Sequence, residues 1–108
     1  MSYSVLLTPV FLKELKKLVK KYPSLKEEYS DLISSLEENP IQGTKLSKNC
    51  YKIRLAIKSK GKGKSGGARV ITLVTIVDET VHLLSIYDKS EQSTISDKRL
   101  QELLDMLE

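Results

Sequence analysis

Residues 69–77 constrain the fold of this chain most, because almost all of them are apolar or β-branched. Such a run, without alternating polar residues, predicts a strand that lies inside a sheet and is buried on both faces. The run is far shorter than the roughly 20 residues that cross a bilayer, so we expect no membrane span. A chain of 108 residues has room for one ordinary domain, and we expect residues 1–108 to form a single one.

Further strands are predicted on both sides of this segment. Residues 50–58 alternate between apolar side chains on one face and basic side chains, including Lys52 and Arg54, on the other. After residue 77 a tight turn leads into a strand over residues 81–87, which makes an antiparallel meander. Residues 3–7 have the composition of a short opening strand.

Three amphipathic helices accompany these strands. Thr8 and Pro9 have the N-cap and first-position chemistry of a helix start. Ser24 and Glu27 have the spacing of a capping box at the start of a second helix, so the two helices are expected to lie antiparallel as a hairpin. Ser96 precedes leucines at helical spacing and predicts a last helix.

The elements follow one another in the order β-α-α-β-β-β-α. This order predicts a two-layer α+β domain with a small antiparallel or mixed sheet, the helical hairpin packed on one face and the helices gathered on that side. Cys50 is the only cysteine, so the chain forms no internal disulfide, which fits the reducing cytoplasm. One cysteine and one histidine are too few for an ordinary zinc site, and we expect no metal and no cofactor.

Positive charge is concentrated in the middle of the chain. The net charge is +4, yet residues 39–77 contain no aspartate or glutamate. The basic residues of this stretch are Lys45, Lys48, Lys52, Arg54, Lys58, Lys60, Lys62, Lys64 and Arg69. A surface that only needs solvation usually mixes both signs, so this stretch predicts a surface that binds a polyanion such as RNA. Taken alone, residues 59–67 fit a solvated lysine loop equally well.

The glycine-rich segment at Gly63-Lys64-Ser65 is not a nucleotide-binding loop. The Walker pattern requires a glycine five residues earlier, where this chain has Lys58. It also requires a following helix whose amides face the phosphates, whereas here a strand is predicted.

A set of cationic and proton-carrying residues falls at the ends of neighbouring strands. Its members are Lys52, Arg54, Arg69, Tyr87, Lys89 and Glu91. Phosphoryl chemistry needs positive charge where the phosphate oxygens gain charge, and groups that move protons. RNA supplies its own nucleophile, the 2′-hydroxyl group. The alternative is that each residue is a solvated charge at the edge of the sheet.

The chain resembles the RelE/ParE superfamily of type II toxin–antitoxin toxins, on the RelE/HigB-like ribonuclease side. The resemblance covers the whole chain through its element order and is carried by residues 49–55 (NCYKIRL), 63–71 (GKSGGARVI) and 86–91 (IYDKSE). It implies a cytoplasmic toxin that cuts messenger RNA, usually on the ribosome, and is neutralised by a cognate antitoxin in a hetero-oligomeric complex.

The resemblance also implies roles for individual residues. The paired basic residues of the family's second strand match Lys52 and Arg54, its phosphate-binding arginine matches Arg69, and its basic residue after the fourth strand matches Lys89. In several family members a catalytic tyrosine lies near the start of the C-terminal helix. This chain departs from that pattern, because the corresponding position is close to Ile95. Tyr87 or Glu91 is therefore expected to handle protons.

Two other functions stay open. A ParE-like chain inhibits DNA gyrase by binding and generally lacks the full cationic set, and a degenerate toxin would only bind its antitoxin. For Arg69 we expect a well-anchored backbone and a free guanidinium group, because no carboxylate lies near it in the sequence.

Overall fold

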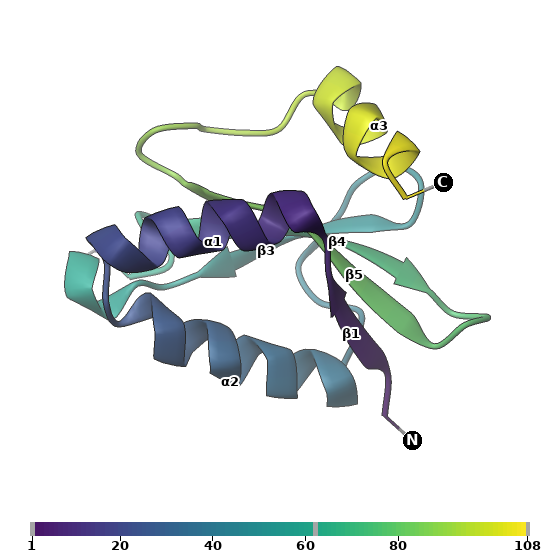
Figure 1. The fold of residues 1–108 in the computed structure, drawn as a ribbon, viewed down its shortest axis with the longest axis horizontal. Helices are drawn as coiled ribbons and strands as arrows, with labels where there is room; N and C mark the ends of the chain where they lie inside the picture. The colour runs from purple at the N-terminus through teal and green to yellow at the C-terminus, as the bar shows by residue number, and fades with distance from the viewer. Residues whose placement is uncertain (1, 62, 108) are drawn as a thin grey trace.

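The chain folds as a five-stranded sheet with three helices (Figure 1). The computed structural model describes residues 2–61 and 63–107. The strands are β1 (Ser4–Leu7), β2 (Thr44–Lys45), β3 (Cys50–Leu55), β4 (Ala68–Thr75) and β5 (Thr80–Asp88). The helices are α1 (Pro9–Lys21), α2 (Leu25–Glu38), α3 (Asp97–Asp105) and the short 3-10 helix η1 (Lys58–Lys60).

Most of the apolar run forms the middle strand of the sheet, as predicted, but β4 ends at Thr75: Ile76 and Val77 lie in the turn that follows and are 64% and 92% exposed. The strand order is β1-β5-β4-β3-β2, with β4 antiparallel to both β3 and β5, while β1 pairs parallel with β5. Val70 and Ile71 are neighbours in β4 and point to opposite faces, and neither is exposed. The two-residue strand β2 is an addition to the strands that the sequence pattern predicts.

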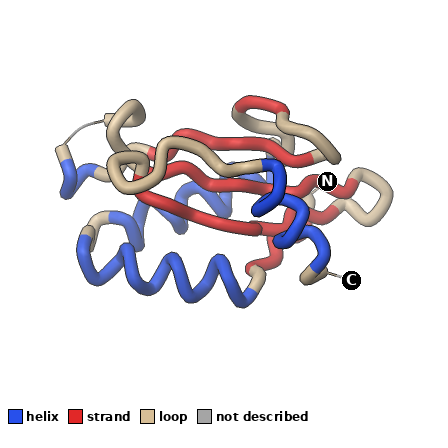
Figure 2. Tube along the Cα trace, turned by 90° about the horizontal axis from the view of Figure 1, so that it is seen from above, coloured by secondary structure: helices blue, strands red, loops and turns tan. Residues whose placement is uncertain are grey.

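Helices α1 and α2 form the expected hairpin and run along one side of the sheet (Figure 2). Thr8 caps α1, because its hydroxyl oxygen accepts a hydrogen bond from the amide of Phe11 at 3.2 Å. The expected capping box at Ser24 is wrong: this hydroxyl makes no cap bond and instead contacts Ser59 and Glu28. Tertiary hydrogen bonds to the segment after β3 replace the local ones.

Helix α3 corrects the expectation that all helices share one face. Leu100 and Leu103 pack with Ile71, Leu84 and Cys50, which form a core cluster separate from the one under the hairpin. Figure 1 shows α3 lying apart from α1 and α2. The sheet is therefore covered by the hairpin on one face and partly by α3 on the other.

No helix in the described part of the chain has the length and apolar content that crossing a membrane requires.

Candidate functional site

Three of the predicted site residues form a row across the sheet. Arg54 of β3 pairs with Arg69 of β4, which in turn pairs with Tyr87 of β5. Directly paired residues of neighbouring strands point to the same face. Tyr87 packs in the cluster of α3, so the row lies on the sheet face that α3 partly covers. Lys52, two residues before Arg54, shares this face.

A basic groove lies next to this row. Its lining includes the cationic side chains of Lys52, Arg54 and Lys64, together with residues 42–44, and its volume is about 390 Å³. Lys64 belongs to the loop that precedes β4, so the groove joins two parts of the chain that both predicted binding to an anion. A concave surface with three cations and no carboxylate in its lining is suited to phosphate groups.

Two glycines allow the backbone to approach closely around this groove. At Gly43, where φ is +87°, a side chain would collide with the carbonyl of Lys52. At Gly67 a side chain would collide with the carbonyl of Leu55. Because it has no side chain, Gly43 lets the segment before β2 lie close to β3. In the same way, Gly67 lets the loop that carries Lys64 lie against the end of β3.

Arg69 is held by this loop, so the expectation of a free guanidinium group is wrong. The residue is only 4% exposed. Its Nη1 atom donates hydrogen bonds to the carbonyls of Lys64 at 2.8 Å and Ala68 at 3.1 Å, and its Nη2 atom donates to that of Ser65 at 3.3 Å. The guanidinium group of Arg69 is thus bound by backbone carbonyls of the loop and of Ala68 instead of by carboxylates. In this conformation Arg69 positions the loop that carries Lys64.

Tyr87 lies beside Arg69 and is also covered. The residue is 5% exposed, and its hydroxyl group has no hydrogen-bond partner among the described residues. Burial raises the pKa of Tyr87, while the charge of Arg69 lowers it by less. The hydroxyl therefore keeps its proton at neutral pH. Ile95, on the segment leading into α3, and Leu100 of α3 pack in the same cluster as Tyr87.

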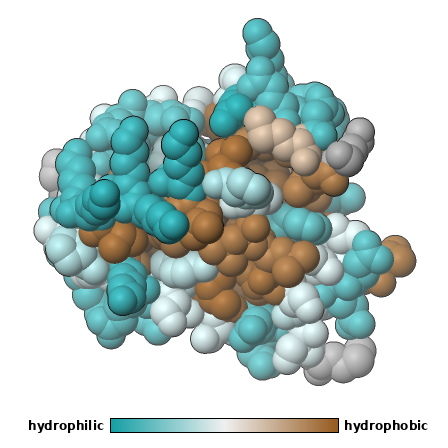
Figure 3. All heavy atoms as spheres, in the orientation of Figure 1, coloured by the Kyte–Doolittle hydropathy of each residue, from teal (hydrophilic) through white to brown (hydrophobic). Residues whose placement is uncertain are grey.

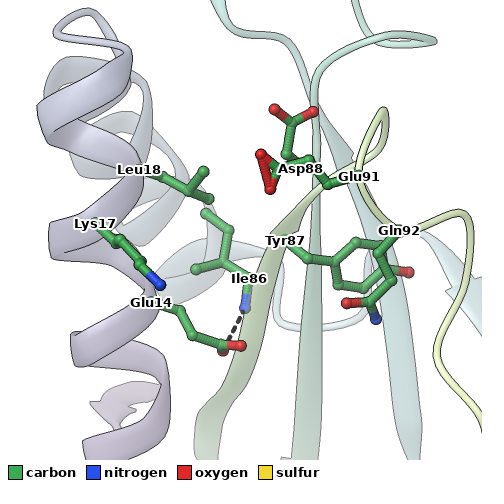
Figure 4. Close-up of a pocket in the computed structure, with 8 residues that line it drawn as sticks. All are labelled: Glu14, Lys17, Leu18, Ile86, Tyr87, Asp88, Glu91 and Gln92. Carbon is green, nitrogen blue, oxygen red and sulfur yellow. Dashed lines mark hydrogen bonds between the residues drawn. The ribbon is translucent and has the colours of Figure 1, made fainter.

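Glu91 lies near Tyr87, and its side chain is directed towards α1, where it pairs with Lys21. Glu91 and Tyr87 line a cavity of about 340 Å³ between α1 and the end of β5 (Figure 4). The carboxylate of Glu91 forms an exposed ion pair with Lys21 at 3.2 Å. Deeper in the cavity, Glu14 accepts a hydrogen bond from the amide of Ile86 at 3.2 Å. Figure 4 shows the Tyr87 ring directed away from α1.

The remaining predicted residues are dispersed around the sheet. Lys89 follows β5, is partly exposed, and donates its amide to the carbonyl of Gly67 at 3.0 Å. Lys45 pairs with Tyr51, which packs on the hairpin side, so Lys45 points to the face opposite Arg54.

Three more lysines complete the predicted set. Lys48 lies in a left-handed turn before β3, with φ of +57°. Lys58 begins η1, where its amide donates to the carboxylate of Glu28 at 2.6 Å, and it shares a second groove with Lys64. Lys62 lies outside the described residues.

A buried ion pair between Lys60 and Asp88 is the main feature that sequence reasoning missed. Their side chains are 9% and 0% exposed, and Asp88 also accepts hydrogen bonds from Tyr22 and Ser90. Burial alone would raise the pKa of Asp88, but the bonds from Lys60, Ser90 and Tyr22 outweigh it and hold that pKa far below its usual range. Since 28 residues separate the pair, no local pattern indicates it.

Comparisons with known proteins identify the family and agree with the fold. The family model described as the RelE toxin of the RelE/RelB toxin–antitoxin system matches residues 9–107. A double arginine-to-alanine variant of the E. coli toxin RelE in the free state has a TM-score of 0.61 at 24% sequence identity, with 86% of this chain and 90% of that chain covered. The isolated E. coli RelE toxin has a TM-score of 0.61 at 19% identity, with 97% and 99% covered. The intact E. coli RelBE toxin–antitoxin complex has a TM-score of 0.60 at 21% identity, with 81% and 96% covered.

Proposed function

This chain belongs to the RelE family, the toxins of RelE/RelB toxin–antitoxin systems, and we propose that it is an endoribonuclease that cleaves messenger RNA in the cytoplasm, on the ribosome. The observation that carries the proposal is the basic groove of Lys52, Arg54 and Lys64 beside the row of Arg69 and Tyr87. RNA phosphates are the polyanion that such a groove fits.

The proposed reaction uses the RNA itself as the nucleophile. The 2′-oxygen attacks the adjacent phosphorus and loses its proton, the bond from phosphorus to the 5′-oxygen breaks, and that oxygen gains a proton. The products are a 2′,3′-cyclic phosphate and a 5′-hydroxyl end, and the mechanism requires no metal-bound water. Arg54, with Lys52 and Lys64, stabilises the charge that develops on the phosphate oxygens. Lys89 adds positive potential from the end of β5.

Proton transfer is assigned to Tyr87 and Glu91. The raised pKa of Tyr87 suits it to give a proton to the leaving 5′-oxygen rather than to accept one. Glu91 ends in an exposed carboxylate on the same cavity and is the candidate acceptor for the 2′-hydroxyl proton. Access to Tyr87 requires movement of the segment that leads into α3, and Arg69 reaches a phosphate only when the loop releases it.

The partner that restrains this activity is a cognate antitoxin. The fold matches that of the toxin in the E. coli RelBE complex, and the family is defined by a toxin–antitoxin pair. A protein with an exposed basic groove needs a binder that neutralises or covers it. We infer a hetero-oligomer in which the antitoxin binds this chain.

The test is primer extension on messenger RNA after brief induction of the chain in cells. We expect discrete cuts within translated regions, in register with codons. Arg54→Ala should reduce them by about two to three orders of magnitude, as expected for the loss of one transition-state charge contact. Lys13→Ala, which removes an exposed lysine of α1, is the matched control and should cut like the parent.

Other outcomes would support the rival functions. DNA breaks with intact transcripts would indicate a gyrase inhibitor resembling ParE. A chain that leaves both RNA and DNA intact but still binds its antitoxin would be a degenerate toxin. Either result would overturn the proposed ribonuclease.

A further inference from the structure

A second groove continues the basic groove around the edge of β3 and reaches α2. It lies beside the part of β3 that β2 does not cover, because β2 pairs only with residues 51 and 52. Its volume is about 320 Å³. The two grooves form one continuous depression, since both are lined by Gln42, Ile53, Arg54 and Lys64.

The second groove has apolar surface on one side and polar side chains on the other. Leu55 and Ala56, at the end of β3, are partly exposed and supply the apolar side. Asp31 and Ser35 lie one turn apart on α2 and line the other side. A slot of this kind suits a nucleobase of RNA, which has apolar faces and a hydrogen-bonding edge.

The free hydrogen-bonding groups at this edge are two acceptors and one hydroxyl donor. The carboxylate of Asp31 is exposed and makes no hydrogen bond or ion pair with another described residue. The amide nitrogen of Gln42 donates to Ser35 Oγ at 2.8 Å and to the carbonyl of Asn39 at 2.7 Å. Both amide hydrogens are therefore used, and only the amide oxygen of Gln42 is left. Ser35 Oγ accepts one of these bonds, so its own hydrogen is available to a ligand.

The charges of the second groove restrict what can bind there. Its other carboxylate, that of Glu28, is already engaged by the amide of Lys58 at 2.6 Å. Asp31 shares the groove with the cationic side chains of Arg54, Lys58 and Lys64. These cations would repel an arginine or lysine of a protein partner, whereas Asp31 would repel a phosphate placed next to it. A neutral group that is rich in donors and joined to an anion meets both conditions.

We propose that the second groove is a base subsite that selects guanine in the RNA strand held by the basic groove, with Asp31 as the specificity-determining residue. The inference rests on the proposed function for the identity of the polymer. Guanine presents two adjacent donors, N1–H and the 2-amino group, which one carboxylate accepts together, and it presents O6 as an acceptor for the Ser35 hydroxyl. Adenine, cytosine and uracil each lack the second adjacent donor.

Apolar surface alone does not provide this selectivity. Figure 3 shows apolar surface between α1 and α2, with hydrophilic side chains gathered along α1. No carboxylate of the described residues lines the groove at that place, so it offers no paired acceptor to the edge of a base. The second groove combines apolar surface, a free carboxylate and adjoining cations.

The direct test compares the binding of four hexanucleotides to the full chain by fluorescence anisotropy. All are 2′-O-methylated, so they lack the nucleophile and are not cut. One contains only uracil, and the others carry one central guanosine, adenosine or inosine, which differs from guanosine only in lacking the 2-amino group. We expect guanosine to bind about tenfold more tightly than uracil or adenosine. Inosine should lose most of this gain, because it offers one of the two donors.

Protein variants assign the preference to Asp31. Asp31→Asn removes the carboxylate at constant size and should reduce the ratio of guanosine to uracil affinity to about one. Glu37→Gln makes the same charge change on α2, outside the groove lining, and should keep the ratio of the parent. Thermal melts show whether both variants are folded. In NMR spectra of the parent, guanosine should shift the amide signals of Asp31, Ser35 and Leu55 more than uracil does.

Three results would overturn the base subsite. They are equal affinity of the parent for the guanosine and uracil oligonucleotides, a guanosine preference that persists in Asp31→Asn, and guanosine-dependent shifts confined to residues outside the second groove. Free GTP that binds as tightly as the guanosine oligonucleotide would assign the groove to a free nucleotide, and would overturn it as well.

These outcomes are distinct from the outcomes of the cleavage experiment. Binding without base preference would remove the subsite and leave the ribonuclease proposal intact. Intact transcripts in cells, together with guanosine preference in the binding assay, would overturn the ribonuclease and leave the subsite. Failure of all four oligonucleotides to bind would overturn both.

Discussion

At the scale of single residues, Arg69 and Arg54 are paired in the sheet and differ in burial. Arg69 is 4% exposed and bonded to the carbonyls of Lys64, Ala68 and Ser65. Arg69→Ala removes these bonds and leaves the carbonyls without their charged donor. We expect the free energy of unfolding to fall by about 1–3 kcal/mol, measured by urea denaturation. Arg69→Lys should recover only part of this loss, because an ammonium group lacks the planar fork.

Arg54→Ala is the matched control for this prediction. The side chain of Arg54 is exposed and makes no hydrogen bond or ion pair with another described residue. Its removal should change the free energy of unfolding by less than about 0.5 kcal/mol while strongly reducing RNA cleavage. If Arg69→Ala proves as stable as Arg54→Ala, the loop does not depend on Arg69.

At the scale of elements, the Lys60–Asp88 pair joins three parts of the fold. Lys60 ends η1, Asp88 ends β5, and the hydroxyl of Tyr22 at the end of α1 donates to Asp88 at 2.9 Å. Asp88→Asn leaves the ammonium group of Lys60 buried without its counter-charge. We expect it to lower the free energy of unfolding by about 3–5 kcal/mol at pH 7, measured by chemical denaturation.

This stabilisation should depend on pH in a defined direction. Because the pKa of Asp88 is lowered in the folded state, its contribution is fully present above the ordinary carboxyl pKa of about 4. It is lost as the pH falls from there through the folded-state value. The stability difference between the parent and Asp88→Asn should be constant from about pH 8 to 5 and shrink below about pH 4. A difference that stayed unchanged down to about pH 2 would contradict the assignment.

At the scale of the whole molecule, the basic stretch of the sequence is divided among several surfaces. Lys60 and Arg69 are engaged internally, and Lys45 faces the other side of the sheet. The residues that remain for RNA at the basic groove and beside the end of β5 are Lys52, Arg54, Lys64 and Lys89. With about four phosphates neutralised, the logarithm of affinity for single-stranded RNA should fall with the logarithm of salt at a slope of about −3.

The measurement uses a 2′-O-methylated RNA, which lacks the nucleophile and so is not cut. Between about 50 and 200 mM salt, the affinity should fall about fifty-fold. Lys52→Ala should reduce the slope by about 0.7, whereas Lys13→Ala should leave it unchanged. A flat salt response of the parent chain would show that the basic groove does not bind phosphate.

The sequence by itself determined most of the helices and strands, and it determined that Lys52 and Arg54 lie on the same face of β3. The β-branched and apolar composition of residues 69–75 is sufficient to predict the central strand β4, because such residues favour a strand that is buried on both faces. The turn at Ile76 and Val77 is not indicated by composition, since both residues are apolar and yet exposed. Thr8 with Pro9 marks the start of α1 through local hydrogen bonding. The two-residue period of β3 places Lys52 and Arg54 together, because side-chain direction in a strand alternates with residue number.

Only the tertiary structure decided which of these charges are free. Lys60 and Lys64 both belong to the same lysine- and glycine-rich segment, and no local pattern distinguishes them. In the structure, however, Lys60 is buried against Asp88, whereas Lys64 lines the basic groove. Arg69 is withdrawn by carbonyls of its own loop, and α3 lies on the face opposite the hairpin. Each outcome depends on contacts between residues distant in sequence, or on how a loop folds back. Local periodicity and capping patterns carry no information about such contacts.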